Sequence, residues 1–108
     1  MSDAEFLYLT TTGRRSGQPR QIEIWFTARD GRYYLVAEHG EQAGWVRNLR
    51  SNPHVRVRVD GREFAARARV VDAATETVLR DDVRQHSERK YGWGDGLVVE
   101  LSPGGDSR

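Results

Sequence analysis

The segment best suited to chemistry is residues 10–20, which reads Thr-Thr-Thr-Gly-Arg-Arg-Ser-Gly-Gln-Pro-Arg. Glycines let backbone N–H groups approach a ligand, hydroxyls add hydrogen-bond donors, and arginine forks bind phosphate or carboxylate. The segment has neither the Gly-Lys-Ser/Thr core of a Walker loop nor a dinucleotide fingerprint. Its composition is equally compatible with an anion site of another kind and with an ordinary glycine-rich turn whose arginines are solvated.

A second candidate is residues 37–48, Ala-Glu-His-Gly-Glu-Gln-Ala-Gly-Trp-Val-Arg-Asn. A glycine loop leads into a predicted helix, and helix N-termini attract anions. Trp45 and Asn48 are three residues apart and share a helix face, where Trp offers a stacking surface and Asn a donor and an acceptor. Alternatively, Trp45 is a core residue at the end of the barrel, and Asn48 is an exposed polar helix residue or bonds to nearby backbone.

Other titratable side chains form weaker patterns. His39, His54 and His86 do not have the spacing of metal ligands, so no metal site is predicted. Glu23 and Glu38 would face each other across a predicted hairpin, where like charges are unfavourable without a cation or donor. This pair indicates either an acid with a raised pKa or a one-residue error in the predicted register.

Two Asp-Gly dipeptides, at 30–31 and 60–61, predict hairpins with two-residue turns. The first separates runs 21–28 and 33–38, and the second separates 55–59 and 62–71. In the first hairpin the predicted pairs are Ile24 with Ala37, Trp25 with Val36 and Phe26 with Leu35. Apolar residues then lie on both faces, which is typical of a barrel wall covered from outside. In the second the predicted pairs are Val55 with Ala66, Val57 with Phe64 and Arg58 with Glu63, the last an ion pair.

The remaining elements complete a small barrel. Strands are predicted over residues 6–10 and 96–101, and a helix over 43–50 that Asn52-Pro53 ends. A second helix is predicted over 73–89. Its N-cap would be Asp72, and its apolar stripe would be Val78, Leu79, Val83 and His86. Tyr91-Gly-Trp93-Gly is either a lid over a cleft or a packed corner, and we favour the corner. Six strands and two helices predict a mainly β fold, a β-barrel with helices at its ends.

Composition limits the classes of protein. The 108 residues fit one domain, predicted over 1–101, with the Gly-rich residues 102–108 as a disordered tail. A formal net charge of +1 with no basic cluster argues against a nucleic-acid binder. The chain has no cysteine, no apolar run of about 20 residues and no signal-peptide pattern, so we expect a cytoplasmic protein without an integral membrane segment.

The order of these blocks resembles the deazaflavin-dependent nitroreductase family. Segment 10–20 is followed by the first hairpin and then by Trp45-Val-Arg-Asn48-Leu-Arg-Ser-Asn52-Pro53. The resemblance runs from about Leu7 to Val71, with a looser match at 90–93. It implies a split β-barrel of the FMN-binding, pyridoxamine-phosphate-oxidase-like type. It also implies an oxidoreductase that binds the deazaflavin coenzyme F-420 and passes its hydride to a small electrophilic acceptor such as a quinone or nitro compound.

The resemblance also implies roles for individual residues. Arg14, Arg15, Ser16 and Gly17 would hold the coenzyme's phosphate and acidic tail. Ala37, Glu38, His39 and Gly40 would line the deazaflavin ring, with Trp45 and Asn48 closing the pocket. No catalytic residue is assigned, because the coenzyme carries the hydride chemistry.

This chain departs from better-known members by having Glu23 on the second strand and Glu38-His39 after the third. These groups would repel an anionic ring or donate a proton beside it. The alternatives are an FMN-binding split-barrel flavoprotein and a non-catalytic cofactor-binding module of the same fold. A homodimer could cover the apolar outer face around Trp25, Tyr34 and Val36.

Overall fold

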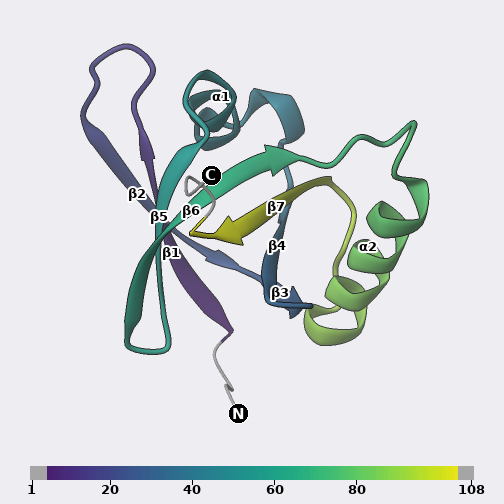
Figure 1. Cartoon of the computed structure of the whole chain (residues 1–108). Helices are drawn as coiled ribbons and strands as arrows, with labels where there is room; N and C mark the ends of the chain where they lie inside the picture. Colours follow the sequence, from purple (N-terminus) through teal and green to yellow (C-terminus); the bar gives the residue numbers. More distant parts are fainter. Residues whose placement is uncertain (1–4, 105–108) are drawn as a thin grey trace.

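The structure of the chain, a computed structural model, describes residues 5–104 and is built on one curled antiparallel sheet (Figure 1). The strands are β1 (Phe6–Thr12), β2 (Pro19–Trp25), β3 (Thr27–Arg29), β4 (Arg32–Ala37), β5 (His54–Val59), β6 (Arg62–Val70) and β7 (Leu97–Pro103). The helices are α1 (Gly44–Ser51) and α2 (Thr77–Tyr91), and a 3-10 turn, η1 (Gly40–Gln42), precedes α1. Within residues 5–104, no helix is long and apolar enough to cross a membrane.

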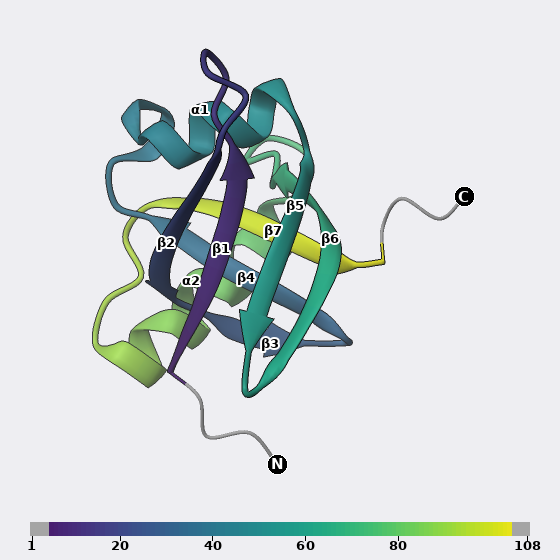
Figure 2. The ribbon, with the colours of Figure 1, turned by 90° about the vertical axis from the view of Figure 1, so that its left-hand side faces the viewer.

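The strand order places consecutive parts of the chain at opposite edges of the sheet. The order is β2-β1-β5-β6-β7-β4-β3, with every neighbouring pair antiparallel. Figure 2 shows β1, β2 and β5 in front of β4 and β7, so the sheet curls around its inner face. β2 and the second half of β4 are not hydrogen-bonded to each other, which leaves a seam in the wall. The predicted mainly β barrel with two helices is confirmed.

The core fills the inside of the curl. Alternate strand residues point to opposite faces, and Leu7 and Leu9 of β1 and Val57 of β5 are fully buried there. Leu49 of α1 packs into the same cluster, which fixes α1 over one end of the sheet (Figure 2). Burying one such side chain stabilises the fold by about 1.5–3 kcal/mol. The core therefore holds β1 and α1, the two elements that frame the site described below.

The predicted strand 21–28 is two strands, and this corrects the first hairpin. The pairs predicted for Ile24, Trp25 and Phe26 are not formed: Ile24 and Trp25 of β2 pair with β1, while Leu35, Val36 and Ala37 of β4 pair with β7. The short β3 keeps the predicted register, pairing Thr27 with Tyr34.

The break at Phe26 is stabilised from α2. The Phe26 N–H donates to the Tyr91 hydroxyl at 3.3 Å, and its carbonyl accepts from that hydroxyl at 2.5 Å and from Lys90 Nζ at 3.1 Å. These partners satisfy backbone groups that a continuous strand would have paired, so the chain can leave one sheet edge and join the other.

The second hairpin is confirmed in register, with Val55 opposite Ala66 and Val57 opposite Phe64. Asp60 and Gly61 have φ of 58° and 78°, as a primed two-residue turn requires. Arg58 lies opposite Glu63 as predicted, but the predicted ion pair between them is wrong. The Arg58 guanidinium lies 4.3 Å from the Tyr8 ring centroid, and Glu63 instead pairs with Arg56 at 3.4 Å.

Helix α2 begins later than predicted. The Asp72 carboxylate accepts from the N–H groups of Ala74 and Thr75 at 2.8 and 3.2 Å, so it caps a separate turn and not the helix. Val78 is 76% exposed, so it does not belong to a buried stripe. β7 extends through Pro103, two residues into the predicted tail, and residues 105–108 lie outside the described part of the chain.

Helix α2 covers Tyr34 and Val36, two of the three residues of the face predicted for a homodimer, and leaves Trp25 41% exposed. Val83 of α2 packs with Tyr34, Val36 and Val98 of the sheet, and Trp93 joins this cluster. The carbonyl of Trp93 accepts from the Ser87 hydroxyl at 2.7 Å. The loop after α2 is therefore a packed corner, as favoured from the sequence.

A chain of polar contacts, buried at Tyr34 and Glu100 and open to solvent at Arg69, connects the sheet to the start of α2. The Tyr34 hydroxyl donates to Glu100 Oε2 at 2.8 Å, and Arg69 Nε donates to Glu100 Oε1 at 2.8 Å. The other end of the Arg69 guanidinium binds both oxygens of Glu76 at 2.8 and 2.7 Å. Burial, and then the hydrogen bond to Glu100, raise the pKa of Tyr34 to about 12.

The raised pKa of Tyr34 gives a stability prediction at high pH. Because the folded-state pKa of this acid exceeds the ordinary value of 10.0, the stabilisation is fully present below pH 10 and is lost as pH rises toward 12. The shift corresponds to roughly 2–3 kcal/mol. Urea unfolding at pH 9 and 11 should show a steeper loss of stability for the wild-type chain than for Tyr34→Phe. Equal losses in the two proteins would contradict the prediction.

Candidate functional site

Two neighbouring pockets share Trp45 and contain most of the residues singled out from the sequence. The arginine pocket has a volume of about 350 Å³ and is lined by Gly13, Arg14, Arg15, Ser16, Arg20, Ile22, Gly44, Trp45 and Asn48. The aromatic pocket has a volume of about 510 Å³ and is lined by Phe6, Glu23, Ile24, Trp25, Val36, Ala37, Glu38, His39, Ala43, Trp45, Tyr91 and Trp93. Together they follow β2 from the β1–β2 loop to the seam beside β4.

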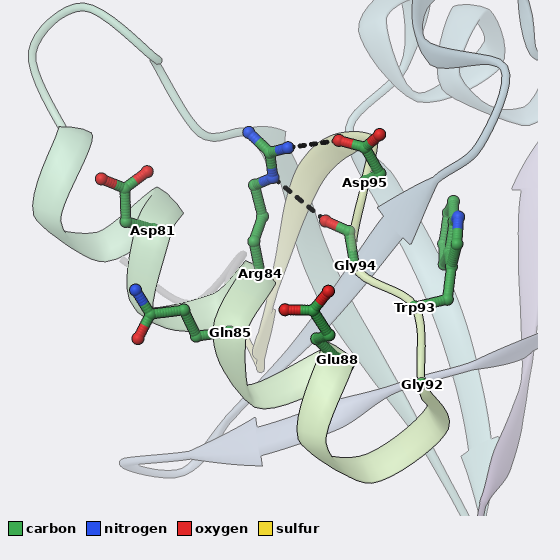
Figure 3. Close-up of a pocket in the computed structure, with 8 residues that line it drawn as sticks. All are labelled: Asp81, Arg84, Gln85, Glu88, Gly92, Trp93, Gly94 and Asp95. Carbon is green, nitrogen blue, oxygen red and sulfur yellow. Dashed lines mark hydrogen bonds and ion pairs between the residues drawn. The ribbon is translucent and has the colours of Figure 1, made fainter.

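A third pocket, between α2 and the loop that follows it, shares only Trp93 with the aromatic pocket and no residue with the arginine pocket. Figure 3 shows Arg84 reaching across it to the carbonyl of Gly94 and to the carboxylate of Asp95. The two contacts measure 3.0 and 2.5 Å. Since the guanidinium of Arg84 is already paired, this pocket offers no free cation to a ligand.

The arginine pocket is shaped by the turn between β1 and β2. The Gly13 N–H donates to the Gln18 carbonyl, and the Gly17 N–H donates to the Gly13 carbonyl, both at 2.8 Å. The Ser16 hydroxyl accepts from the Gln18 N–H at 3.1 Å. A Cβ on Gly13 would lie 2.9 Å from the Ser16 hydroxyl oxygen and 3.2 Å from the Gln18 carbonyl oxygen, so a side chain here would push the Ser16 hydroxyl out of its present position. The turn thus holds the arginines that follow Gly13 against α1.

Unlike several other arginines of the chain, those of this pocket have no carboxylate partner among the described residues. Arg50, Arg69 and Arg84 form ion pairs with carboxylates. Across residues 5–104, neither Arg14, Arg15 nor Arg20 is ion-paired. Several uncompensated guanidiniums around one cavity repel each other unless an anion joins them, and they supply the forked donors that phosphates and carboxylates bind. The donor set of this pocket therefore fits a polyanionic ligand.

The aromatic pocket offers flat surfaces at the seam. Trp25 stacks on Tyr91 with centroids 4.6 Å apart and an interplanar angle of 10°, and Phe6 is tilted against Trp25 at 6.4 Å. The Tyr91 hydroxyl is held by the carbonyls of Phe26 and Glu5. Phe6 and Trp25 each remain 41% exposed, which is unusual for such large apolar side chains. This wall suits a planar, mostly apolar ring system.

A family comparison decides what kind of protein combines these pockets. The model of the F420H2-dependent quinone reductase family matches residues 1–95. The chain belongs to this family. F420H2 is the reduced form of coenzyme F-420, so the family is the one whose fold and coenzyme the sequence motifs indicated.

Individual relatives agree with the family assignment. An F420H2-dependent quinone reductase of Mycobacterium tuberculosis (strain H37Rv) is 41% identical over 69 residues, as is a putative one of Mycobacterium bovis. The match covers 60% of this chain and 46% of each relative. The chain therefore spans about half the length of the curated relatives it matches.

Solved structures support the split-barrel fold of this F420H2-dependent quinone reductase family member. An F420-H2 dependent reductase, FDR-A, has a TM-score of 0.74 at 23% identity, over 94% of this chain and 97% of that one. A putative pyridoxamine 5'-phosphate oxidase from Listeria innocua has a TM-score of 0.72 at 17% identity, over 94% and 85% of the two chains. At these identities the likeness concerns the fold.

The structure brings together most of the residues to which the family resemblance gave roles. Arg14, Arg15, Ser16 and Asn48 line the arginine pocket, while Ala37, Glu38 and His39 line the aromatic pocket and Trp45 lines both. Two residues lie elsewhere: Gly17 lines a separate cavity beside β5, and Gly40 begins η1 outside either lining. The roles of all these residues remain predictions.

The predicted contact of Glu23 with Glu38 across a hairpin is wrong, because Glu23 pairs with Tyr8 in the β1–β2 ladder. The Tyr8 hydroxyl donates to Glu23 at 3.4 Å. Both carboxylates nevertheless line the aromatic pocket, on opposite sides of the seam. His54 and His86 line neither of the two pockets. In the part of the chain that the structure describes, no group of three or more metal-ligating side chains gathers.

Several lining residues were absent from the predicted set, and one signal could have found some of them. Arg20, Ile22 and Ile24 alternate along β2, so they share one strand face. This alternation, which starts at Arg20 beside the glycine turn, is the sequence signal that identifies these β2 residues as lining the two pockets. Tyr91 and Trp93 come from the far end of the sequence, and no local pattern places them beside Trp25.

Proposed function

We propose that this chain binds coenzyme F-420 and acts as an oxidoreductase that transfers a hydride from the reduced coenzyme to a quinone or a similar small electrophile. The observation that carries the proposal is the adjacency of the two pockets, with uncompensated arginines at one end and an aromatic wall at the other. F-420 has a matching division into an acidic tail and a planar ring. Family membership supports the same coenzyme.

In this proposal the chain binds and orients, and the coenzyme supplies the hydride when bound. Arg14 and Arg15, with the Ser16 hydroxyl of the same pocket, hold the acidic tail. Arg20 adds a further charge to the same cavity. Trp45 lies between the tail and the ring because it lines both pockets.

At the ring end, the aromatic wall excludes water, and Ala37, Glu38 and His39 border the ring. The Tyr91 hydroxyl is held by main-chain carbonyls. This leaves His39, exposed at the pocket, as the side chain best suited to pass a proton to the reduced acceptor.

Parallel titrations of oxidised F-420 and FMN test the proposal. Tryptophan fluorescence should be quenched by F-420 at concentrations at least tenfold lower than by FMN, because the three arginines match the longer acidic tail. With reduced F-420 and a soluble benzoquinone, the visible absorbance of the oxidised coenzyme should appear. Tighter binding of FMN would make the chain a flavoprotein instead. Coenzyme binding without reduction of any acceptor would make it a cofactor-binding module.

The partner chain and the location in the cell remain predictions. A similar structure with 22% identity and a TM-score of 0.64 is described as a domain-swapped dimer. Since α2 covers Tyr34 and Val36, a second copy of this chain would cover the exposed pair Phe6 and Trp25 instead. A cytoplasmic location agrees with a reduced soluble coenzyme as the hydride source.

A further inference from the structure

We propose that Asn48 is a positioning residue, which fixes Arg14 for the coenzyme's acidic tail without neutralising its charge. This inference rests on the proposed function. It changes the role suggested by the family resemblance, in which Asn48 closes the pocket around the coenzyme.

The contacts of Asn48 are directed at the protein. Its amide oxygen accepts from the Arg14 backbone N–H at 3.2 Å and from Arg14 Nη1 at 2.8 Å. Its Nδ2 donates to the hydroxyl of Thr11 at 3.2 Å. Asn48 and Thr11 are 6% and 2% exposed, so this is a buried bridge between α1, β1 and the glycine turn. Both lone pairs of the amide oxygen are used by one arginine.

The bridge leaves a defined edge of the Arg14 guanidinium open. The two Nη1–H groups are directed to Asn48 and to the Gly44 carbonyl, the latter at 3.4 Å. The Nε–H and Nη2–H groups have no acceptor among residues 5–104. These groups form the side of the fork that binds a phosphate or carboxylate through two parallel hydrogen bonds.

The amide is chemically suited to this task. A neutral oxygen orients the guanidinium and leaves its full positive charge for a ligand. A carboxylate at the same place would also orient it, but it would form a buried ion pair that competes with the anionic ligand. Arg15 and Arg20 have no comparable holder among the described residues, so Arg14 is the arginine that is ordered before binding.

A double-mutant cycle on coenzyme affinity tests the positioning role. Fluorescence titration with F-420 should show that Arg14→Ala and Asn48→Ala each weaken binding by roughly tenfold or more. The double variant should bind no more weakly than Arg14→Ala alone, because both changes remove one unit. Asn48→Asp should also weaken binding, since it keeps the acceptor and cancels the charge. Additive losses, or full affinity in Asn48→Asp, would overturn the proposal.

A measurement without ligand separates this inference from the proposed function. Hydrogen exchange of the Arg14 amide should accelerate in Asn48→Ala and stay unchanged in Asn52→Ala. The control removes the side-chain amide of the C-cap residue of α1, whose oxygen accepts from the His54 N–H at 3.1 Å, outside both pockets. Thr11→Val, which removes only the acceptor for Nδ2, is the milder variant if Asn48→Ala fails to fold, and it should show a smaller acceleration.

Unchanged exchange in the Asn48 or Thr11 variant would overturn the positioning role. Absence of F-420 binding by the wild-type chain would overturn the proposed function, while the exchange data would still decide whether Asn48 holds Arg14.

Discussion

Replacing Arg14 and Arg15 together with alanine should weaken the binding of F-420 by about 100-fold or more. Hydrogen bonds to charged groups contribute about 1.5–3 kcal/mol each, and the two arginines face one cavity without carboxylate partners. Their loss also lowers the local positive potential that attracts a polyanion. The measurement is a fluorescence titration of the wild-type and variant chains at one salt concentration.

A second double variant separates contact from overall charge. Arg67→Ala with Arg89→Ala removes the same number of positive charges from exposed positions outside both pockets. This control should change the affinity less than about threefold at physiological salt, because distant exposed charges are screened. An Arg14/Arg15 variant that binds as tightly as this control would remove the basis for an anion site in the β1–β2 turn.

Replacing Gly94 with alanine should lower the free energy of unfolding by roughly 3 kcal/mol, at the upper end of overpacking effects. The added Cβ would lie 2.2 Å from the Arg84 carbonyl oxygen and 3.3 Å from the Glu88 backbone nitrogen. Both atoms belong to the backbone of α2, so relief requires the corner to move away from the helix. Thermal unfolding followed by circular dichroism should show a Tm lowered by more than about 10 °C.

The matched control is Gly44→Ala. A Cβ there meets nothing within 4 Å, and the residue is the first of α1, where alanine is well tolerated. Its Tm should be unchanged or slightly higher. Equal Tm values for the two variants would mean that the loop after α2 can shift freely, which would contradict its description as a packed corner.

Local signals predicted those parts of the fold that depend on neighbouring residues. The Asp60-Gly61 turn sets the register of its hairpin by its own backbone preference, so Val57 lies opposite Phe64 as expected. Two arginines of the arginine pocket could be predicted from the sequence for the same reason. Arg14 and Arg15 are adjacent to the glycine that shapes their turn, and their chemistry can be interpreted without the rest of the fold.

Parts of the fold that depend on distant residues could not be predicted in this way. The break at Phe26 is stabilised by Lys90 and Tyr91, which lie more than sixty residues later in the chain. A register predicted from the Asp30-Gly31 turn alone continues the strand through Phe26, because no neighbouring residue in the sequence indicates a break there. The stacking of Tyr91 on Trp25, which forms the wall of the aromatic pocket, could not be predicted either, because these residues are far apart in the sequence.

The seam between β2 and β4 affects which amino-acid substitutions would change coenzyme binding. β3 pairs with β4 only as far as Tyr34, so from Leu35 to Ala37 the side of β4 that faces β2 has no partner strand among residues 5–104. Main-chain groups on an open strand edge can bond a flat heterocycle as they would bond an added strand. Leu35, Val36 and Ala37 are buried, so the core must first accept any replacement there, and an accepted replacement leaves those main-chain groups in place. In the proposed function, binding of the acidic tail instead depends on the side chains of Arg14 and Arg15. We therefore expect conservative core replacements on β4 to change coenzyme affinity less than replacements of these two arginines.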